Sequence, residues 1–200
     1  MTLSIIHYPH PTLRHRSRSV VRVDQRLKDL AAEMLDLMYE NEGVGLAANQ
    51  VDLPIRLFVA NETGRRGEGD EMICVNPEID RPKGSESSQE GCLSVPGIYG
   101  QVKRPKTVRL HAYDLQGNEI RRELDGFLAR VVQHEIDHLD GTMFFDRMTD
   151  ESRRELDGPL TEFQVDFESK RVAGSIEDDE AIAERRRRWE IDYTGLQANT

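Results

Sequence analysis

The sequence has little cysteine and no long apolar run. Only two of its 200 residues are cysteines, so a framework of several disulfides is excluded, although the sequence leaves open whether Cys74 and Cys92 pair with each other. No apolar stretch approaches the roughly 20 residues that a membrane-spanning helix needs, and the N-terminus shows no secretory pattern. We therefore expect a cytoplasmic protein in a reducing compartment, with no membrane partner.

Positive charge is also in short supply. The formal net charge of -10 argues against strong affinity for nucleic acid, and we expect no recognition of a specific nucleic acid sequence. What is present, 37% hydrophobic and 32% charged residues, is typical of a soluble globular protein. A chain of 200 residues is long enough for a single hydrophobic core.

The most informative segment is residues 133–141, which contain an H-E-x-x-H motif formed by His134, Glu135 and His138. On a helix, the spacing of four residues places both imidazoles on one face, where they can bind a divalent metal while Glu135 reaches a water on that metal. The alternative is two buried histidines with ordinary hydrogen-bond partners, and the pattern favours the metal site.

The residues around this motif have the pattern of a helix. Asp125 is a candidate N-cap, and Gly141 suits the C-terminal cap. Apolar residues recur at spacings of three and four: Phe127, Leu128, Val131, Val132, Ile136 and Leu139.

Two histidines leave a zinc-like site one protein ligand short. The long metalloprotease motif would place a third histidine where Phe144 stands, and phenylalanine cannot bind a metal. A downstream glutamate such as Glu155 or Glu162 would still allow a metalloprotease. Cys92 is the better candidate; it lies in the Gly- and Pro-rich residues 90–97, which predict a turn at the end of a strand. A non-catalytic metal- or peptide-binding module is a further alternative.

Residues 43–50 form a third unusual segment, rich in small side chains. Gly43 and Gly45 flank one aliphatic residue, so a ligand backbone can approach closely and pair with the chain in an extended form. The segment also has to end the amphipathic helix predicted for residues 24–41, and both roles can hold. Cys74, in an apolar run, is predicted to be a small buried hydrophobe.

Taken in order, G-V-G-L-A-A-N-Q, E-G-C-L-S and Q-H-E-I-D-H-L-D-G resemble the three motifs of the peptide deformylase family. The opening residues 5–14 also resemble the start of that family, and the resemblance covers residues 3–148. It implies a metal-dependent hydrolase that removes the formyl group from the N-formylmethionine of nascent polypeptides and releases formate.

The resemblance implies a role for each matched position. Cys92, His134 and His138 would be the metal ligands, Glu135 the general acid and base, and Gln50 with the backbone amide of Leu93 the oxyanion donors. It also implies one Fe(II) per chain, with Zn, Ni or Co as substitutes. The walls of the methionine pocket would include Val44, Gly45, Phe127, Val131 and the ring of His134, and the substrate backbone would pair with Val44, Gly45 and Gly91. By its helix spacing, Arg130 also falls on the pocket side.

Arg130 is the one departure, because many relatives carry an aliphatic residue there. One expectation is that the Arg130 stem lines the pocket while its guanidinium reaches solvent. The alternative is that Arg130 is an ordinary solvated residue of the helix surface.

Strand patterns predict an α+β fold in which antiparallel sheets pack around the central metal-binding helix. The predicted strands are residues 56–60, 72–79, 107–113 and 119–124, with a turn at residues 116–118 joining the last two into a hairpin. We expect a catalytic domain over residues 1–148 and a charged C-terminal extension over residues 149–200. The extension is expected to be partly helical or flexible, with a short helix over residues 181–189 and little ordered core.

Four consecutive arginines, Arg185 to Arg188, lie in that extension. The resemblance implies a C-terminal helix near the ribosome, so the run could touch RNA phosphates, but its acidic surroundings favour a solvated helix face. We expect a monomer.

Overall fold

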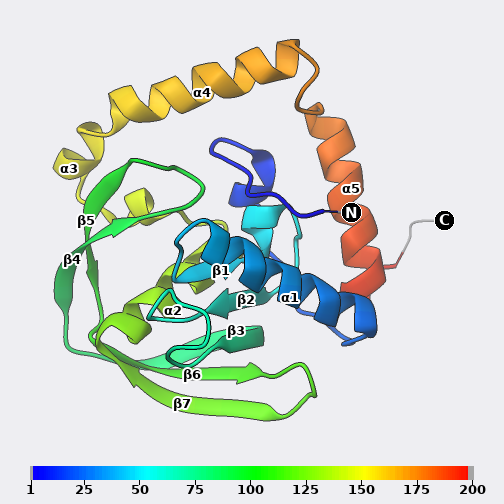
Figure 1. The fold of residues 1–200 in the computed structure, drawn as a ribbon. Helices are drawn as coiled ribbons and strands as arrows, with labels where there is room; N and C mark the ends of the chain where they lie inside the picture. The colour runs from blue at the N-terminus through cyan, green and yellow to red at the C-terminus, as the bar shows by residue number, and fades with distance from the viewer. Residues whose placement is uncertain (1, 198–200) are drawn as a thin grey trace.

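The computed structural model describes residues 2–197 and has an α+β architecture. All strands pair antiparallel, in a five-stranded sheet of order β1-β2-β3-β6-β7 and a separate two-stranded sheet β4-β5 (Figure 1). The strands are β1 (Gly45–Ala47), β2 (Leu57–Ala60), β3 (Met72–Lys83), β4 (Glu86–Gly91), β5 (Tyr99–Arg104), β6 (Thr107–Tyr113) and β7 (Glu119–Asp125).

Four strands were predicted and three were missed. β2, β3 and the β6-β7 hairpin confirm the predicted strands, although β3 continues to Lys83. β1 has only three residues, too few for an alternating pattern to show. β4 and β5 were missed because their sequences are mostly polar and show no apolar alternation. Only Glu90, Val102 and Arg104 in them are buried.

Helix α1 (Gln25–Glu40) confirms the predicted amphipathic helix. The Asp24 carboxylate caps it by accepting a hydrogen bond from the Leu27 N–H at 2.9 Å. The buried stripe of α1 packs with residues of β1 and β2 in the first core cluster. The stripe consists of Leu27, Leu30, Ala31, Met34, Leu35 and Met38.

Helix α2 (Gly126–Leu139) carries the H-E-x-x-H motif, as predicted, and packs on the five-stranded sheet. Asp125 occupies the N-cap position but its side chain makes no capping hydrogen bond, which corrects that prediction. Gly141 takes the left-handed conformation, with φ of 75°, directly after the helix end. Phe127, predicted on the apolar face, is 55% exposed.

Cys74 is fully buried in β3, as predicted, and burial raises the pKa of its thiol to about 12. Both cysteines are free, so no disulfide joins them. None of the helices within residues 2–197 is long and apolar enough to cross a bilayer.

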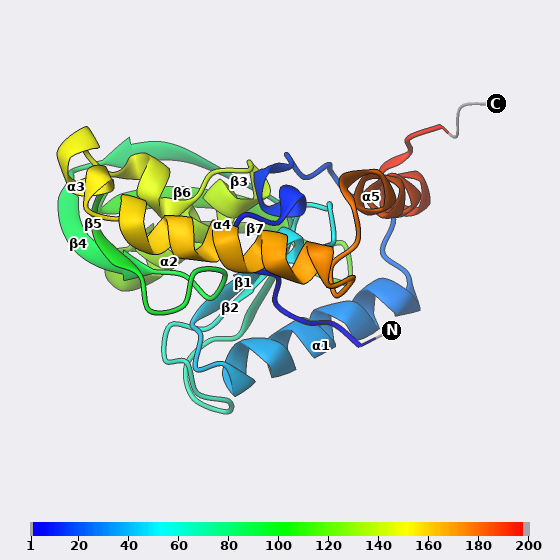
Figure 2. The ribbon, with the colours of Figure 1, turned by 90° about the horizontal axis from the view of Figure 1, so that it is seen from above.

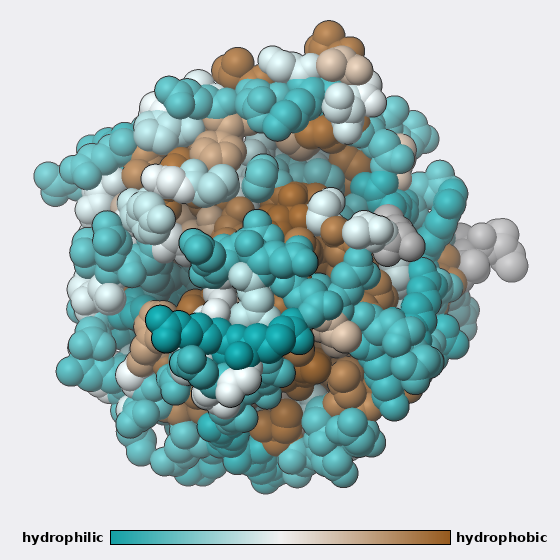
Figure 3. All heavy atoms as spheres, in the orientation of Figure 1, coloured by the Kyte–Doolittle hydropathy of each residue, from teal (hydrophilic) through white to brown (hydrophobic). Residues whose placement is uncertain are grey.

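The C-terminal segment forms three helices: α3 (Asp150–Arg154), α4 (Asp157–Val172) and α5 (Asp179–Thr194). In Figures 1 and 2, α4 runs along one side of the molecule and α5 follows it back towards α1. Figure 3 shows a largely hydrophilic face with apolar residues gathered in the hollow below α4.

This packing corrects the expectation that little ordered core extends beyond residue 149. Leu160, Phe167, Ile182, Trp189 and Tyr193 are all buried, the last two against the core cluster that contains α1. The missed signal is the spacing of seven and then four residues between the three buried apolar positions of α5, which places them on one helix face. The boundary between a domain at residues 1–148 and an extension stays a prediction.

Candidate metal centre

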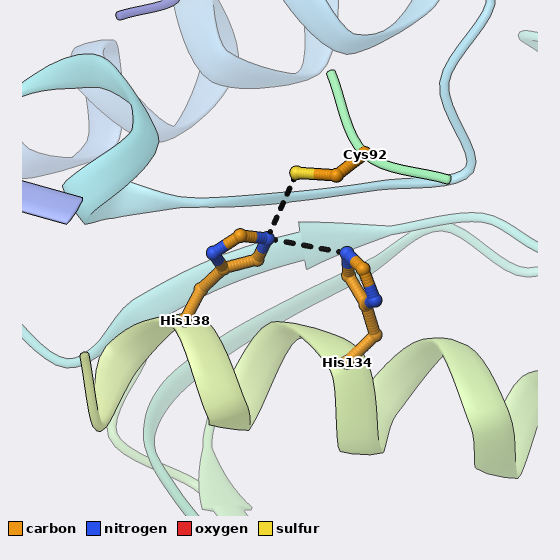
Figure 4. Close-up of side chains that lie close together, drawn as sticks. All are labelled: Cys92, His134 and His138. Atoms are coloured by element: carbon orange, nitrogen blue, oxygen red, sulfur yellow. Dashed lines mark hydrogen bonds between the residues drawn. The ribbon is translucent and has the colours of Figure 1, made fainter. Parts of the chain in front are cut away.

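The side chains of Cys92, His134 and His138 converge beside helix α2 (Figure 4). His134 and His138 project from consecutive turns of α2, and Cys92 follows the last residue of β4. The Nε2 atom of His138 lies 3.2 Å from the Cys92 sulfur and 3.1 Å from Nε2 of His134. All three donor atoms lie within 4.8 Å of one another. The residues predicted as ligands are therefore brought together, although 42 residues separate Cys92 from His134 in the sequence.

The spacing of these donor atoms fits a divalent metal. Tetrahedral coordination with bonds of about 2.05 Å to nitrogen and about 2.3 Å to sulfur keeps neighbouring donors about 3.3 to 3.6 Å apart. The two separations that involve His138 are slightly shorter, and the remaining pair of donor atoms lies within 4.8 Å. Burial lowers the pKa of His138 well below its ordinary value, which favours the neutral ring that metal ligation requires. Burial would also lower the pKa of His134, but hydrogen bonds with Cys92 and Glu90 raise it to about 10. The Ser94 N–H points at the sulfur at 3.3 Å and suits a negatively charged ligand.

Glu90 holds His134 in place. The Nδ1–H of His134 donates to Oε2 of Glu90 at 3.0 Å, which leaves Nε2 directed towards the other donors. Arg104 contacts the same carboxylate through Nε at 2.6 Å and Nη2 at 2.9 Å. Burial alone would raise the pKa of Glu90, but hydrogen bonds from His134 and Arg104 hold it well below its usual range. Glu90 is therefore ionised and fixes the orientation of this imidazole.

Arg130 belongs to the same ionic network. It is only 7% exposed, and Nη1 donates to Oε1 of Glu90 at 2.6 Å and to the carbonyl oxygen of Val102 at 3.0 Å. The sequence predicts that this guanidinium reaches solvent, either from the pocket wall or from a solvated helix surface. Both predictions are wrong, because the side chain is buried against Glu90. Helix spacing could not reveal the cause, because the buried carboxylate that pairs with Arg130 lies 40 residues away in the sequence.

Arg104 and Asp137 extend the network and were not identified from the sequence. Nη1 of Arg104 donates to Asp137 at 2.7 Å, and Nε of Arg147 donates to the same carboxylate at 3.0 Å. Asp137 lies inside the H-E-x-x-H motif, so its position on the helix was visible. No local pattern marks Arg104 as its partner.

Glu135 lies beside the metal ligands and is 3% exposed. Burial raises its pKa to about 7, which is suited to a group that both accepts and donates a proton near neutral pH. Its Oε2 atom is buried and has no hydrogen-bond partner among the described residues. The backbone of β1 lies directly against it, because a Cβ at Gly45 would come within 2.8 Å of the Glu135 carboxyl carbon.

Gln50 also lies beside the site and is 2% exposed. Its Oε1 accepts from the Ala47 N–H at 2.9 Å, which fixes the orientation of the amide. Its Nε2 then donates towards the Cys92 sulfur at 3.4 Å and the Ser94 hydroxyl at 3.2 Å. The amide N–H groups therefore face the metal site. Ser94, which is fully buried, was not identified from the sequence.

A cleft of about 560 Å³ opens beside the three converging side chains. Leu93, half-buried, lines it together with His134 and Glu135. Tyr99 also lines it and is 58% exposed, but sequence reasoning did not identify it. All the predicted substrate-binding residues border this cleft: Val44, Gly45, Gly91, Phe127, Arg130 and Val131.

A site that brings together one cysteine sulfur, two imidazoles, a buried carboxylate and a cleft defines a metal-dependent hydrolase. Glu155 and Glu162 are absent from the potential metal-binding group found among residues 2–197, so the metalloprotease alternative has no third ligand there.

Comparison with known proteins identifies the family. The model of the polypeptide deformylase family matches residues 2–154. The peptide deformylase of Rhodopirellula baltica is 68% identical over 195 residues, which cover 98% of this chain and 97% of that protein. A crystal structure of peptide deformylase 1B from Arabidopsis thaliana in complex with an inhibitor has a TM-score of 0.82 at 40% identity, covering 90% of this chain and 99% of that one. A peptide deformylase from Legionella pneumophila has a TM-score of 0.76 at 36% identity, covering 82% and 96%.

The chain belongs to the polypeptide deformylase family. It is a hydrolase that removes the formyl group from the N-formylmethionine of nascent polypeptides, and members of this family are metalloenzymes.

Proposed function

We propose that Cys92, His134 and His138 hold the catalytic metal and that Glu135 is the general acid and base. The observation that carries this assignment is the convergence of one sulfur and two Nε2 atoms within 4.8 Å, next to a buried carboxylate whose pKa is raised to about 7. We further propose one Fe(II) per chain, with Zn, Ni or Co as substitutes, because a donor set of one thiolate and two imidazoles suits several of these metals.

Glu135 and the oxyanion donors divide the chemistry between them. When bound, the metal supplies Lewis acidity, which lowers the pKa of a water that it holds from about 15.7 towards about 7. Glu135 accepts the proton of the attacking water and returns it to the leaving amine. The Gln50 amide and the Leu93 N–H stabilise the negative charge on the former formyl oxygen, each contributing about 3 kcal/mol.

The cleft suits an extended peptide that begins with methionine. Val44, Gly45 and Gly91 line the cleft and would offer backbone groups to the substrate. Phe127, Val131 and the stem of Arg130 would contact the methionine side chain. The Arg130 charge is directed away into the pair with Glu90, so the wall that it forms is effectively apolar.

The wider setting follows the sequence predictions. We propose a monomeric, cytoplasmic enzyme with a catalytic domain at residues 1–148 and an extension at residues 149–200 that contacts the ribosome. The arginine run has limited freedom for such a contact, because Arg185 pairs with Asp52 and Glu177, and Arg188 pairs with Glu184. Contact with RNA phosphates would fall steeply with added salt.

The ligand set is tested by replacing each cysteine in turn. Cys92→Ser should lose metal, because a serine hydroxyl is a poor ligand at neutral pH, whereas Cys74→Ser is the matched control and should keep it. Metal content per chain after anaerobic purification gives the answer. The assignment is wrong if the control loses metal and Cys92→Ser retains it.

The oxyanion arrangement is tested by substrate choice. Formate release from a formyl-Met peptide is compared with acetate release from the matching acetyl-Met peptide. We expect kcat/KM to be far lower for the acetyl group, because donors aimed at one small carbonyl leave little room for a methyl. Equal rates would contradict the proposed site.

A further inference from the structure

Helix α5 lies outside the segment that the family model matches, yet it reaches the turn that carries Gln50. That turn is the short helix η2 (Ala48–Val51), and Asp52 ends it in the left-handed conformation, with φ of 62°. The Asp52 N–H bonds back to the Asn49 carbonyl at 3.3 Å and so closes the turn. The position of Asp52 therefore bears directly on the backbone that holds Gln50.

The Asp52 carboxylate is held from two sides. Thr12 donates its hydroxyl to Oδ1. From α5, Arg185 donates to Oδ2 through Nε at 2.6 Å and lies 2.5 Å from it through Nη2. The side chains of Asp52 and Arg185 are only 12% and 28% exposed, so solvent screens this pair less than an ion pair on the surface.

Gln50 needs such support because an oxyanion donor acts only when its N–H points at the developing negative charge. The Ile6 N–H donates to the Gln50 carbonyl at 2.8 Å, and the side-chain amide is aimed by Ala47 and Ser94. A shift of about 1 Å in a reacting group can cost about 100-fold in rate. Movement of η2 would turn the amide away from the developing oxyanion without changing the residues that bind the substrate.

We propose that Arg185 is a positioning residue that acts through Asp52 to hold Gln50 in its catalytic orientation. The inference rests on the proposed role of Gln50 as an oxyanion donor. It gives the C-terminal helix a part in the rate of the reaction, because the helix clamps the turn that carries the donor.

The experiment is a double-mutant cycle measured on the metal-loaded full chain with a formyl-Met peptide. Arg185→Ala should lower kcat about 10-fold, less than the roughly 100- to 1,000-fold expected for Gln50→Ala, with KM changed by less than about 2-fold. In the Gln50→Ala background, Arg185→Ala should have no further effect, because the donor that it positions is already gone. Arg188→Ala on the same helix, 73% exposed, is the matched control and should keep the wild-type kcat.

The outcomes distinguish the oxyanion role of Gln50 from the positioning role of Arg185. If Gln50→Ala keeps the wild-type kcat, the oxyanion role itself fails. If Gln50→Ala is impaired but Arg185→Ala either has no effect or lowers kcat equally in both backgrounds, the positioning role fails and the oxyanion role stands. If Arg185→Ala does not fold, Arg185→Lys carries the same cycle. It should lose part of kcat, since an ammonium cannot present the planar pair of N–H groups to Oδ2.

Discussion

Helices α2 and α5 are similar in length, with 14 and 16 residues, but they bury very different surfaces. Ten residues of α2 are buried, and they include Arg130, Glu135, Asp137 and His138, each a polar group that needs a partner. α5 buries four residues, and eight of its other twelve residues are charged. α2 is therefore fixed by a dense polar network, whereas α5 is fixed by a few aromatic contacts and ion pairs.

The difference shows where stability and chemistry lie in this enzyme. Substitutions in and around α2 should change the reaction, because its side chains meet at the metal site. Substitutions in α5 should mainly change how firmly the helix is attached, apart from the link through Arg185. The following predictions test this division, in order of expected effect.

The largest effect is expected at Glu135. Glu135→Gln keeps the shape of the side chain but cannot accept a proton, so kcat should fall by about 100- to 10,000-fold. Metal content and the melting temperature should stay close to those of the wild type. Formate release under saturating substrate measures the loss, and turnover near the wild-type rate would contradict the assignment of Glu135 as the base.

Trp189 should be the strongest contact of α5. Its ring is 5% exposed, and the Arg26 guanidinium lies 4.1 Å from the ring centroid. Trp189→Ala should lower the free energy of unfolding by about 3 kcal/mol, measured by urea denaturation. Val172→Ala on α4 is the control, because Val172 is 90% exposed and its replacement should change stability by less than about 0.5 kcal/mol. Equal effects would show that α5 contributes no core.

Gly45 tests how tightly β1 packs against α2. Gly45→Ala should reduce kcat by about 100-fold, because the added methyl would displace the Glu135 carboxylate. The sequence predicts Gly45 only as a point of close ligand approach, and the contact with Glu135 is an additional constraint. Gly158→Ala on α4 is the matched control, since its Cβ would meet no atom within 4 Å. If both variants keep the wild-type kcat, a methyl group at Gly45 does not displace the Glu135 carboxylate, and the prediction is wrong.

His10 should give the smallest effect, seen as a pH dependence of stability. Burial and the nearby Arg185 and Arg186 outweigh Asp52 and lower its pKa to about 4 from an ordinary 6.5. The unfolded chain therefore binds a proton that the folded chain resists. Stability is retained above pH 6.5 and is lost as the pH falls towards 4, by about 2 kcal/mol between pH 7 and pH 5.

The matched variant for this test is His10→Asn, which can still cap the short helix η1 (Pro11–Arg14). Urea denaturation of both proteins at the two pH values isolates the contribution of His10. A wild type and variant with the same pH dependence would exclude this histidine as its source.

Residues whose roles follow from local spacing were predictable from the sequence. The α1 stripe, the β6-β7 hairpin and the helical H-E-x-x-H motif each repeat with the period of their secondary structure. Arg130 and Arg104 were not predictable, because a buried carboxylate distant in sequence decides their environment. β4 was missed because it has no buried apolar residue. The helix predicted over residues 181–189 lies within α5, but its packing on the core was not predicted, because its three apolar contacts lie among charged residues.

The two-stranded sheet β4-β5 has one further consequence for how the molecule opens. A hairpin alone is only marginally stable, and this one is joined to α2 by the ionic contacts of Glu90 with Arg130 and of Arg104 with Asp137. Its Val102 packs in an apolar cluster with Phe144 and Phe145, which follow α2 in the chain. If the hairpin separated only in part from α2, buried charges would be left without partners, and such partly open states would be high in free energy. Fraying from one end is therefore disfavoured, and the hairpin and α2 should open as one cooperative unit. Amide hydrogens of β4, β5 and α2 should then exchange with a shared free energy of opening.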